Sequence, residues 1–463
     1  MLFRKYTARL ESFLQNEPHK ILLVNGARQI GKSYLIRYVC KRLFQNYIEI
    51  NLKADKEGQG IFATVRSTDD FYLQLGAIAG NRLGNWDNTI IFLDEIQSYP
   101  HLMTMLKFLN EDGRYRYIAS GSELGVALAQ TPSVPIGSIA IEQMYPLDFE
   151  EFLLAMGTGQ ETIDGIRRYF NERKALNSSM HDYMLRQFKI YLLVGGMPDA
   201  INKFIENRNI AHVRQIQQDI HSLYRLDASQ YDKEKKLVIR NIYDMIPSNM
   251  ENRKKRIIVK NIEKSAGHKQ FTDYSDEFEY LTNSGVALAV QAISNPKFPL
   301  KESESKNLVK LYMSDVGLLT NLLYRTNINA VLGDERSINL GSVYESVVAQ
   351  ELHAHGYTLH YYDNKQRGEV DFLTDDYDNL TVLPIEVKSG KDYKIHSALN
   401  SFLSTPDYNI RKAVVLSNSP DVYEENGITY MPVYYIMFFN GYSTAAGTVI
   451  PEIAPIQESG FFL

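Results

Sequence analysis

The sequence has little of what disulfide-bonded, zinc-binding or membrane-spanning proteins need. Its 463 residues include one cysteine, Cys40, which excludes an internal disulfide, and they show no zinc-ligand cluster. Residues 1–15 are mixed and charged and contain no signal-peptide core. The most apolar late stretch, residues 431–439, is too short to span a bilayer and predicts a core strand. We therefore expect a cytoplasmic protein with no membrane partner.

An excess of one charge is also absent. The formal net charge is −5 at pH 7, which gives no global attraction to nucleic acid but is compatible with a locally basic surface. Hydrophobic residues, in contrast, make up 44% of the chain, enough for several cores. A chain of this length is expected to form about three or four units.

The most informative feature is an apolar strand at residues 21–25 that runs into the pattern G-x-x-x-x-G-K-[ST]. Gly26 and Gly31 let successive backbone N–H groups point inward and cradle phosphate oxygens. Lys32 would place a cation against the β- and γ-phosphates, and the Ser33 hydroxyl would complete the shell of a Mg²⁺ ion. The pattern therefore predicts ATP and Mg²⁺ as ligands. The predicted nucleotide-binding residues are Gly26, Ala27, Arg28, Gln29, Ile30, Gly31, Lys32, Ser33 and Tyr34.

A second apolar run, residues 89–95, ends in two carboxylates and suits a strand buried on both faces of a parallel sheet. Asp94 would hold Mg²⁺, directly or through water, and Glu95 would polarise the water that attacks the γ-phosphate. With Lys32 they form the predicted catalytic set. A third strand, residues 115–119, is followed by Ser-Gly-Ser, in which Ser122 is a candidate γ-phosphate sensor; an ordinary turn is the alternative.

Four domains are expected along the chain. The first is an α/β core of doubly wound type at residues 1–145, and a helical lid follows at 146–227. Residues 228–325 combine helical patterns with two strand-like pieces and resemble a winged helix. The last unit, residues 326–463, is a separate α/β domain.

The third domain carries the basic run 253–256, which would contact DNA phosphates. Acidic residues lie nearby, so a solvated helix face of mixed charge is the favoured alternative. The run therefore supports nucleic-acid contact only weakly.

The last domain contains a second group of polar residues. Residues 368–373 and 383–388 are predicted strands, and Glu386 and Lys388 lie two apart, so they share a face within reach of Asp371. A predicted helix upstream adds Glu345. The set resembles the PD-(D/E)xK restriction-endonuclease-like fold, which implies carboxylates that hold Mg²⁺ and a lysine that orients the attacking water.

A solvated ion pair is the alternative for this set, and the fold would not by itself establish activity. The sequence thus leaves open whether the last domain cuts DNA or only binds it.

Several motifs occur in one order: the phosphate loop, the carboxylate pair, residues 145–149 and residues 195–198. Together they resemble the AAA-type ATPases of bacteria and archaea that carry a C-terminal domain of unknown function. Residues 311–319 look like the junction that those proteins use before their last domain.

One departure concerns ATP turnover. Many such proteins have a basic residue just after the glycine that precedes the Tyr-Pro segment, whereas in this chain Gly137 is followed by Ser138. Arg114 and Arg116 are candidates by position for an arginine finger donated to a neighbouring subunit, and exposed strand-flanking arginines are the favoured alternative.

The sequence therefore predicts an ATP-binding and ATP-hydrolysing protein whose nucleotide state controls a last domain that binds DNA or a protein partner. An ATP-gated, metal-dependent DNA nuclease is one alternative, and a nucleotide-dependent signalling switch without nucleic acid is another. The identity of the partner, and whether the chain forms a homo-oligomer, stay open.

Overall fold

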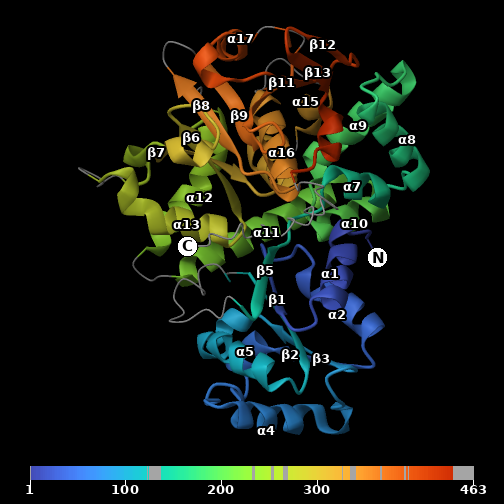
Figure 1. The fold of residues 1–463 in the computed structure, drawn as a ribbon, viewed down its shortest axis with the longest axis vertical. Helices are drawn as coiled ribbons and strands as arrows, with labels where there is room; N and C mark the ends of the chain where they lie inside the picture. Colours follow the sequence, from blue (N-terminus) through green and yellow to red (C-terminus); the bar gives the residue numbers. More distant parts are fainter. Residues whose placement is uncertain are drawn as a thin grey trace, which may run out of the picture.

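The N-terminal α/β region lies at the bottom of Figure 1, below a larger body formed by the helical region and a second sheet. This computed structural model describes residues 2–122, 124, 137–231, 235–251, 255–263, 269–325, 327–333, 340–364, 368–390, 393–394 and 396–441. None of the helices in these ranges is long and apolar enough to cross a membrane.

The first sheet has five parallel strands in the order β2-β3-β4-β1-β5. Residues of β1 alternate between two apolar cores, one on each face of the sheet, which explains the unbroken apolar run in the sequence. The sheet is of the P-loop type that the sequence predicts. Its strands are β1 (Ile21–Asn25), β2 (Asn46–Asn51), β3 (Thr89–Asp94), β4 (Arg116–Gly121) and β5 (Ile139–Gln143). Its helices are α1 (Lys5–Asn16), α2 (Lys32–Leu43), α3 (Leu52–Glu57), α4 (Thr68–Ala79) and α5 (Pro100–Asp112).

Helices follow the first sheet, as the sequence predicts. The Gly-Gly turn between α9 and α10 is present, and a Cβ at Gly196 would collide with the backbone of Leu147, so the lid packs there against the chain leaving β5. The helices are α7 (Phe149–Ala155), α8 (Gln160–Asn171), α9 (Ser178–Val194), α10 (Pro198–Asn207), α11 (Ile210–Tyr231), α12 (Lys236–Glu251) and α13 (Ser275–Asn283).

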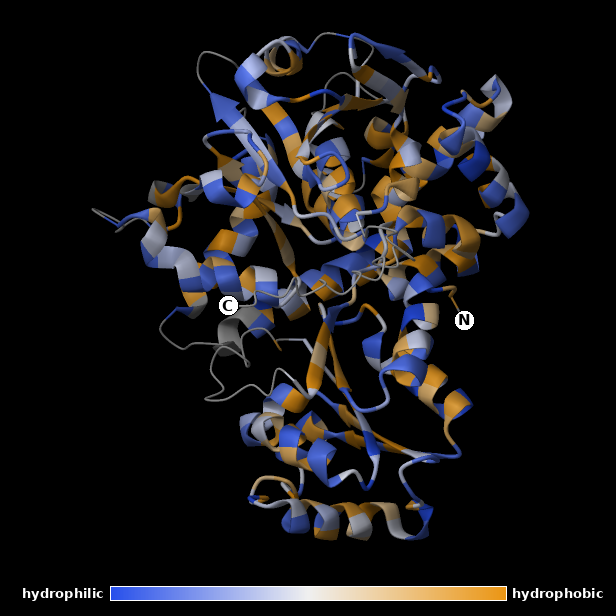
Figure 2. Cartoon of the chain, in the orientation of Figure 1, coloured by the Kyte–Doolittle hydropathy of each residue, from blue (hydrophilic) through white to orange (hydrophobic). Residues whose placement is uncertain are grey.

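The second sheet is mixed and has eight strands in the order β12-β13-β11-β10-β9-β8-β6-β7. Its strands are β6 (Ala287–Ile293), β7 (Glu304–Met313), β8 (His360–Asn364), β9 (Gly368–Asp376), β10 (Thr381–Lys388), β11 (Ala413–Ser417), β12 (Tyr423–Glu425) and β13 (Ile428–Pro432). Four helices accompany it: α14 (Val316–Tyr324), α15 (Ile328–Leu332), α16 (Leu340–Ala354) and α17 (Ser397–Leu403). Figure 2 shows hydrophobic residues gathered on α16 and on the strands around it.

Two sequence-based expectations differ from this arrangement. The strands β6 and β7 do not form a separate two-stranded wing, because β6 also pairs with β8 and so joins the hairpin to the last sheet. The sheet thus crosses the expected boundary at residues 325/326. The apolar run 431–439 is not one strand: β13 ends at Pro432, and a buried 3₁₀ helix, η7 (Val433–Phe438), follows.

One apolar core extends from the first sheet through the lid helices to α16 and η7. A core shared in this way mechanically links the region at the end of β1 to the second sheet.

Candidate functional site

The loop after β1 has the backbone that a phosphate cradle needs. Gly26 has φ 148° and Gly31 has φ 92°, both in the range that side chains disfavour. A Cβ at Gly26 would also collide with the carbonyl oxygen of Met144. Gly31 caps the N-terminus of α2, so the loop delivers its N–H groups and the helix dipole to one place.

Lys32 is buried inside this loop, with 7% of its surface exposed. Its Nζ donates hydrogen bonds to the carbonyl oxygens of Gly26 and Ala27, both at 2.8 Å. Burial lowers the pKa of Lys32 to about 8, because these neutral acceptors do not fully replace water around the ammonium group. The charges of Glu95 and Asp94 oppose this lowering of the pKa without cancelling it, so an anionic ligand in the cradle would add stabilising counter-charge.

Asp94, at the end of β3, faces the start of α2. Its Oδ1 accepts hydrogen bonds from the hydroxyls of Ser33 at 2.9 Å and Ser120 at 2.5 Å. Burial raises the pKa of Asp94, since neutral hydroxyls do not balance its charge. The hydroxyl and carboxylate oxygens together are the donor set that Mg²⁺ prefers, so these residues fit that ion.

Glu95 follows with a left-handed backbone, φ 56°, at the start of the 3₁₀ helix η2 (Ile96–Ser98). The Gln97 amide donates hydrogen bonds to Glu95 Oε2 at 2.5 Å and to Ser122 Oγ at 3.4 Å. Ser122, the candidate sensor, is buried and also accepts a hydrogen bond from Arg28 Nε at 3.3 Å. Gln97 belongs to none of the motifs recognised in the sequence; its position two residues after Glu95 was the available signal.

Later parts of the chain cover the same loop. Arg28 pairs with Asp227 of α11 at 2.6 Å, and Tyr224 donates a hydrogen bond to the Arg28 carbonyl oxygen at 3.1 Å. A Cβ at Gly285, before β6, would lie 2.8 Å from the Ala27 nitrogen. The loop is therefore in contact with α11 and with the turn that enters the second sheet.

The two candidate arginine fingers lie elsewhere. Arg116 begins β4, donates a hydrogen bond to the Leu14 carbonyl oxygen and stacks over Phe44 and Trp86. Arg114 pairs with Asp112 and stacks over Tyr72. Both stand at the N-terminal end of β4, opposite the edge that carries the phosphate loop.

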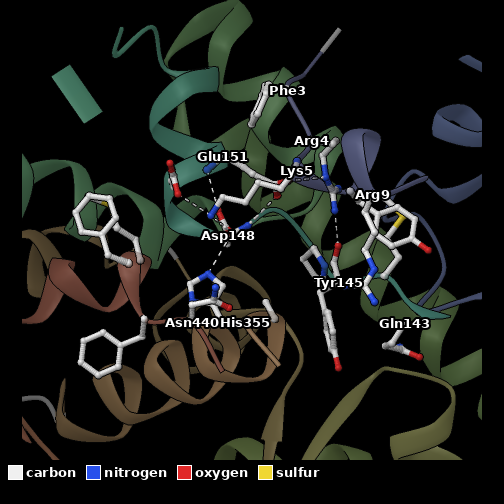
Figure 3. A pocket seen from close by; sticks show the side chains of 18 of the residues that line it. Phe3, Arg4, Lys5, Arg9, Gln143, Tyr145, Asp148, Glu151, His355 and Asn440 are labelled. Carbon is white, nitrogen blue, oxygen red and sulfur yellow. Dashed lines mark hydrogen bonds and ion pairs between the residues drawn. The ribbon is translucent and has the colours of Figure 1, made fainter. Parts of the chain in front are cut away.

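A cavity of about 620 Å³ lies where the N-terminal segment, the β5–α7 connection, α8, the end of α16 and the end of η7 meet (Figure 3). Asp148 accepts from Lys5 Nζ at 2.7 Å, contacts His355 Nε2 at 3.2 Å and forms a capping box with Glu151 on α7. Arg4 donates to the carbonyl oxygens of Ile30, in the phosphate loop, and Tyr145. We call these contacts the three-way junction, because they join the first sheet, the lid and the last domain.

The carboxylates of the junction differ in their charge balance. Burial alone would raise the pKa of Asp148, but the charges of Lys5 and His355 outweigh it and hold the pKa well below its usual range. Burial raises the pKa of Glu151 to about 7, an effect that Arg4 opposes and the charge of Asp148 reinforces.

The nuclease-like set in the last domain is also brought together. Asp371 Oδ2 accepts a hydrogen bond from the Val387 N–H at 2.9 Å, and Lys388 Nζ binds Glu386 Oε1 at 2.7 Å. Burial and the charges of Glu345 and Glu386 raise the pKa of Asp371 well above its usual value.

Two lysines that sequence reasoning missed enter this set. Lys255 pairs with Glu345, and Lys310, fully buried, pairs with Glu369 at 2.5 Å. Lys255 belongs to the basic run, of which residues 253 and 254 lie outside the described residues. Among the residues described, no group of three or more His, Cys, Asp or Glu side chains is arranged to hold a metal ion.

The phosphate cradle, the buried lysine and the Ser33–Asp94 pair define a P-loop nucleotide-binding domain. Residues 18–153 match the family model described as AAA domain. Residues 185–329 match a domain of unknown function (DUF8612), and residues 340–436 match another (DUF4143). The chain thus carries an AAA-type ATPase domain, which implies nucleotide binding, typically with Mg²⁺, followed by regions whose function is unknown.

No curated protein matches the sequence. The fold is similar to the Walker-type ATPase paby2304 of Pyrococcus abyssi, with 13% identity, a TM-score of 0.43, and 70% of this chain and 96% of that chain covered. It is also similar to the RuvB Holliday junction branch migration motor of Thermotoga maritima, with 13% identity, a TM-score of 0.30, and 67% and 92% covered. Both similarities are distant and support no conclusion about this chain.

Proposed function

We propose that this chain hydrolyses ATP with Mg²⁺ at the phosphate loop, and that its nucleotide state controls a C-terminal domain that binds DNA or a protein partner. The observation that carries the proposal is the pairing of Ser33 with Asp94, next to Glu95 and the buried Lys32. Phosphate cradle, metal ligands and candidate base thus lie at one edge of the first sheet.

Each residue has a defined part in this reaction. Lys32 turns from the carbonyl oxygens of Gly26 and Ala27 to the β- and γ-phosphates, while the loop N–H groups bind the remaining oxygens. Ser33 and Asp94 would hold Mg²⁺, which would neutralise negative charge on the phosphates. Glu95 accepts a hydrogen bond from the attacking water and orients it.

The contacts of α11 support transmission of the nucleotide state. At one end, Asp227 and Tyr224 bind Arg28 in the phosphate loop. Further along α11, Gln217 donates to the Val194 carbonyl oxygen at 3.0 Å, and Arg214 donates to the Gly317 carbonyl oxygen at 3.2 Å. A shift of the loop on ATP binding would therefore move α9 and α14 together with α11.

The lid and last domain are tied in turn. Asp315, which caps α14, accepts a hydrogen bond from the Gly196 N–H at 2.6 Å. Gln350 of α16 accepts one from the Val316 N–H at 2.8 Å. These buried bonds favour movement of lid and second sheet as one body relative to the first sheet.

Binding by the last domain is favoured over cutting. Its carboxylates Glu345, Glu386 and Glu369 each have a lysine partner, so their charge is already balanced without a metal. A nuclease of the resembled kind needs carboxylates that bind Mg²⁺. The nuclease alternative predicts DNA cleavage with Mg²⁺ or Mn²⁺ that is lost in Asp371→Ala.

The deciding experiment is steady-state ATP hydrolysis by the full chain beside Lys32→Ala and Glu95→Gln, with Lys388→Ala as the matched lysine control. Lys32→Ala should lose binding and turnover, Glu95→Gln should bind ATP without turning it over, and Lys388→Ala should match the unchanged protein. Undiminished turnover in Lys32→Ala would overturn the proposal.

The partner is tested by measuring DNA affinity across salt concentrations. DNA affinity that falls steeply with salt would support DNA as the partner, whereas no affinity at low salt would favour a protein partner or a signalling switch.

A further inference from the structure

A line of side-chain contacts runs from Glu95 to helix α11. Gln97 Nε2 donates to Glu95 Oε2 at 2.5 Å and to Ser122 Oγ at 3.4 Å. Arg28 Nε reaches the same Ser122 oxygen at 3.3 Å, and Arg28 pairs with Asp227 of α11 at 2.6 Å. We call these five residues the Glu95–Asp227 line.

The local backbone makes Glu95 dependent on such support. Glu95 has left the regular strand and has φ 56°, a region that costs a non-glycine residue about 1 kcal/mol or more. The strand therefore does not fix the direction of its carboxylate. Among the described residues, it is the hydrogen bond from Gln97 that fixes the direction of the Glu95 carboxylate.

The residues around Gln97 leave room for its side-chain amide. A Cβ at Gly121 would collide with Gln97 Oε1, so the amide lies directly against the end of β4. Any larger residue at position 121 would displace it. The Ser-Gly-Ser sequence at the end of β4 is thus more than a turn: Gly121 makes room for the amide and Ser122 binds it.

We propose that Gln97 is the positioning residue for Glu95, and that the Glu95–Asp227 line makes the placement of the Glu95 carboxylate depend on α11. This inference rests on the proposed ATP hydrolysis. Gln97 acts through Glu95, which orients the water, whereas phosphate binding rests on Lys32 and the loop. The inference therefore predicts an effect on kcat and not on ATP affinity.

The first test is Gln97→Met, which has a similar length and no hydrogen-bond donor. We expect kcat to fall about 10- to 100-fold, because a misplaced catalytic group costs up to about 10²-fold. KM and the affinity for a fluorescent ATP analogue should stay within about twofold. A purely structural role would instead lower the unfolding temperature and change kcat and affinity together.

The second test addresses α11. Asp227→Asn removes the partner of Arg28 and should lower kcat about three- to tenfold in the unchanged protein. In the Gln97→Met background it should lower kcat no further, because the line is already broken. The matched control is Asp244→Asn, which removes a neighbouring ion pair between α12 and Arg225 of α11 but does not touch the line. Its kcat should be unchanged.

The outcomes separate this inference from the proposed function. If Glu95→Gln abolishes turnover and Gln97→Met does not change kcat, ATP hydrolysis stands and the inference is wrong. Additive effects of Gln97→Met and Asp227→Asn would overturn the dependence on α11. If Glu95→Gln hydrolyses ATP normally, the proposed function itself fails.

Discussion

The molecule contains two acid–lysine sites that differ in what balances their charges. At the end of β3, Asp94 is bound by the hydroxyls of two serines and Glu95 by the amide of Gln97, all neutral donors. On α16 and the second sheet, Glu345, Glu386 and Glu369 are bound by lysines. Asp94 and Glu95 therefore accept hydrogen bonds from neutral groups, whereas three of the four carboxylates in the second site form an ion pair with a lysine.

The partners of the carboxylates distinguish the two sites better than the identities of the residues do. Both sites match a metal-dependent pattern in the sequence, but only in the second do lysines already occupy positions beside the glutamates, where a divalent cation would otherwise bind. Two of the three lysines in the second site, Lys255 and Lys310 of β7, come from parts of the chain distant in sequence from their partners, so the electrostatics of the site depend on tertiary packing.

The largest expected effect tests the comparison directly. Asp94→Asn should lower Mg²⁺-dependent ATP turnover by about 10³-fold, because it removes a metal-binding carboxylate in a buried site. Asp371→Asn, the same change in the second site, should alter turnover less than about twofold. The measurement is kcat/KM for ATP at saturating Mg²⁺.

Equal losses in the two variants would contradict the distinction between the sites. A normal rate in Asp94→Asn at high Mg²⁺ would show that Asp94 does not hold the metal.

The next prediction removes one lysine charge from the second site. Lys310 is fully buried; burial alone would lower its pKa, but Glu345 and Glu369 outweigh this and raise it. Lys310→Met should destabilise the fold by about 3 kcal/mol, since removing one partner leaves a poorly compensated carboxylate. Calorimetric unfolding of the full chain measures this. Lys174→Met, which breaks an exposed Lys–Glu pair, should show no measurable change.

The same variant also tests whether Lys310 takes the place of a metal cation in the second site. With Lys310 gone, the cluster of Glu345, Asp371 and Glu369 loses a cation, so Mn²⁺ should raise the unfolding temperature more in Lys310→Met than in the unchanged protein. An equal shift in both proteins would mean that the lysine does not stand in for a cation.

Much of the first site was predictable because its determinants are local. The strand at residues 21–25, the glycines of the loop and the Ser33–Asp94 pairing follow from short patterns read on a parallel sheet. The wing prediction was wrong because β6 finds a partner, β8, whose strand begins some 70 residues later, a pairing that strand periodicity does not encode. Lys255 and Lys310 were missed for the same reason: their partners Glu345 and Glu369 are brought to them by tertiary packing. Gln97 differs, because its partner Glu95 is only two residues away and the contact depends on the left-handed backbone at Glu95.

The three-way junction gives a smaller, pH-dependent effect. The pKa of Asp148 is below its unfolded value of about 3.8, so its charge stabilises the fold above that pH and the contribution is lost as pH falls through the folded pKa. Asp148→Asn should therefore cost about 2 kcal/mol from pH 7 down to about pH 4, and progressively less below about pH 4. Thermal unfolding from pH 7 to about pH 2 is the measurement.

Glu151 is the matched comparison in the same capping box. Burial raises its pKa to about 7, so stability of the unchanged protein falls as pH rises from about 4.3 to 7. Glu151→Gln removes this fall and should change the free energy of unfolding little at pH 6. A larger loss at pH 6 from Glu151→Gln than from Asp148→Asn would show that the charge assignment at the junction is reversed.

The smallest expected effect concerns the arginines near the first sheet. Arg114 is half-exposed, is paired with Asp112 and lies at the N-terminal end of β4, away from the phosphate loop. Arg114→Ala should therefore change ATP turnover less than about twofold, whereas loss of an arginine finger costs about 10³- to 10⁵-fold. The assay is run across chain concentrations, because a finger donated by a second copy would act only in an assembly. A loss of 10³-fold that appears with rising concentration would place Arg114 in a neighbour's site, and the charge needed for turnover would then come from outside the chain that holds Asp94 and Glu95.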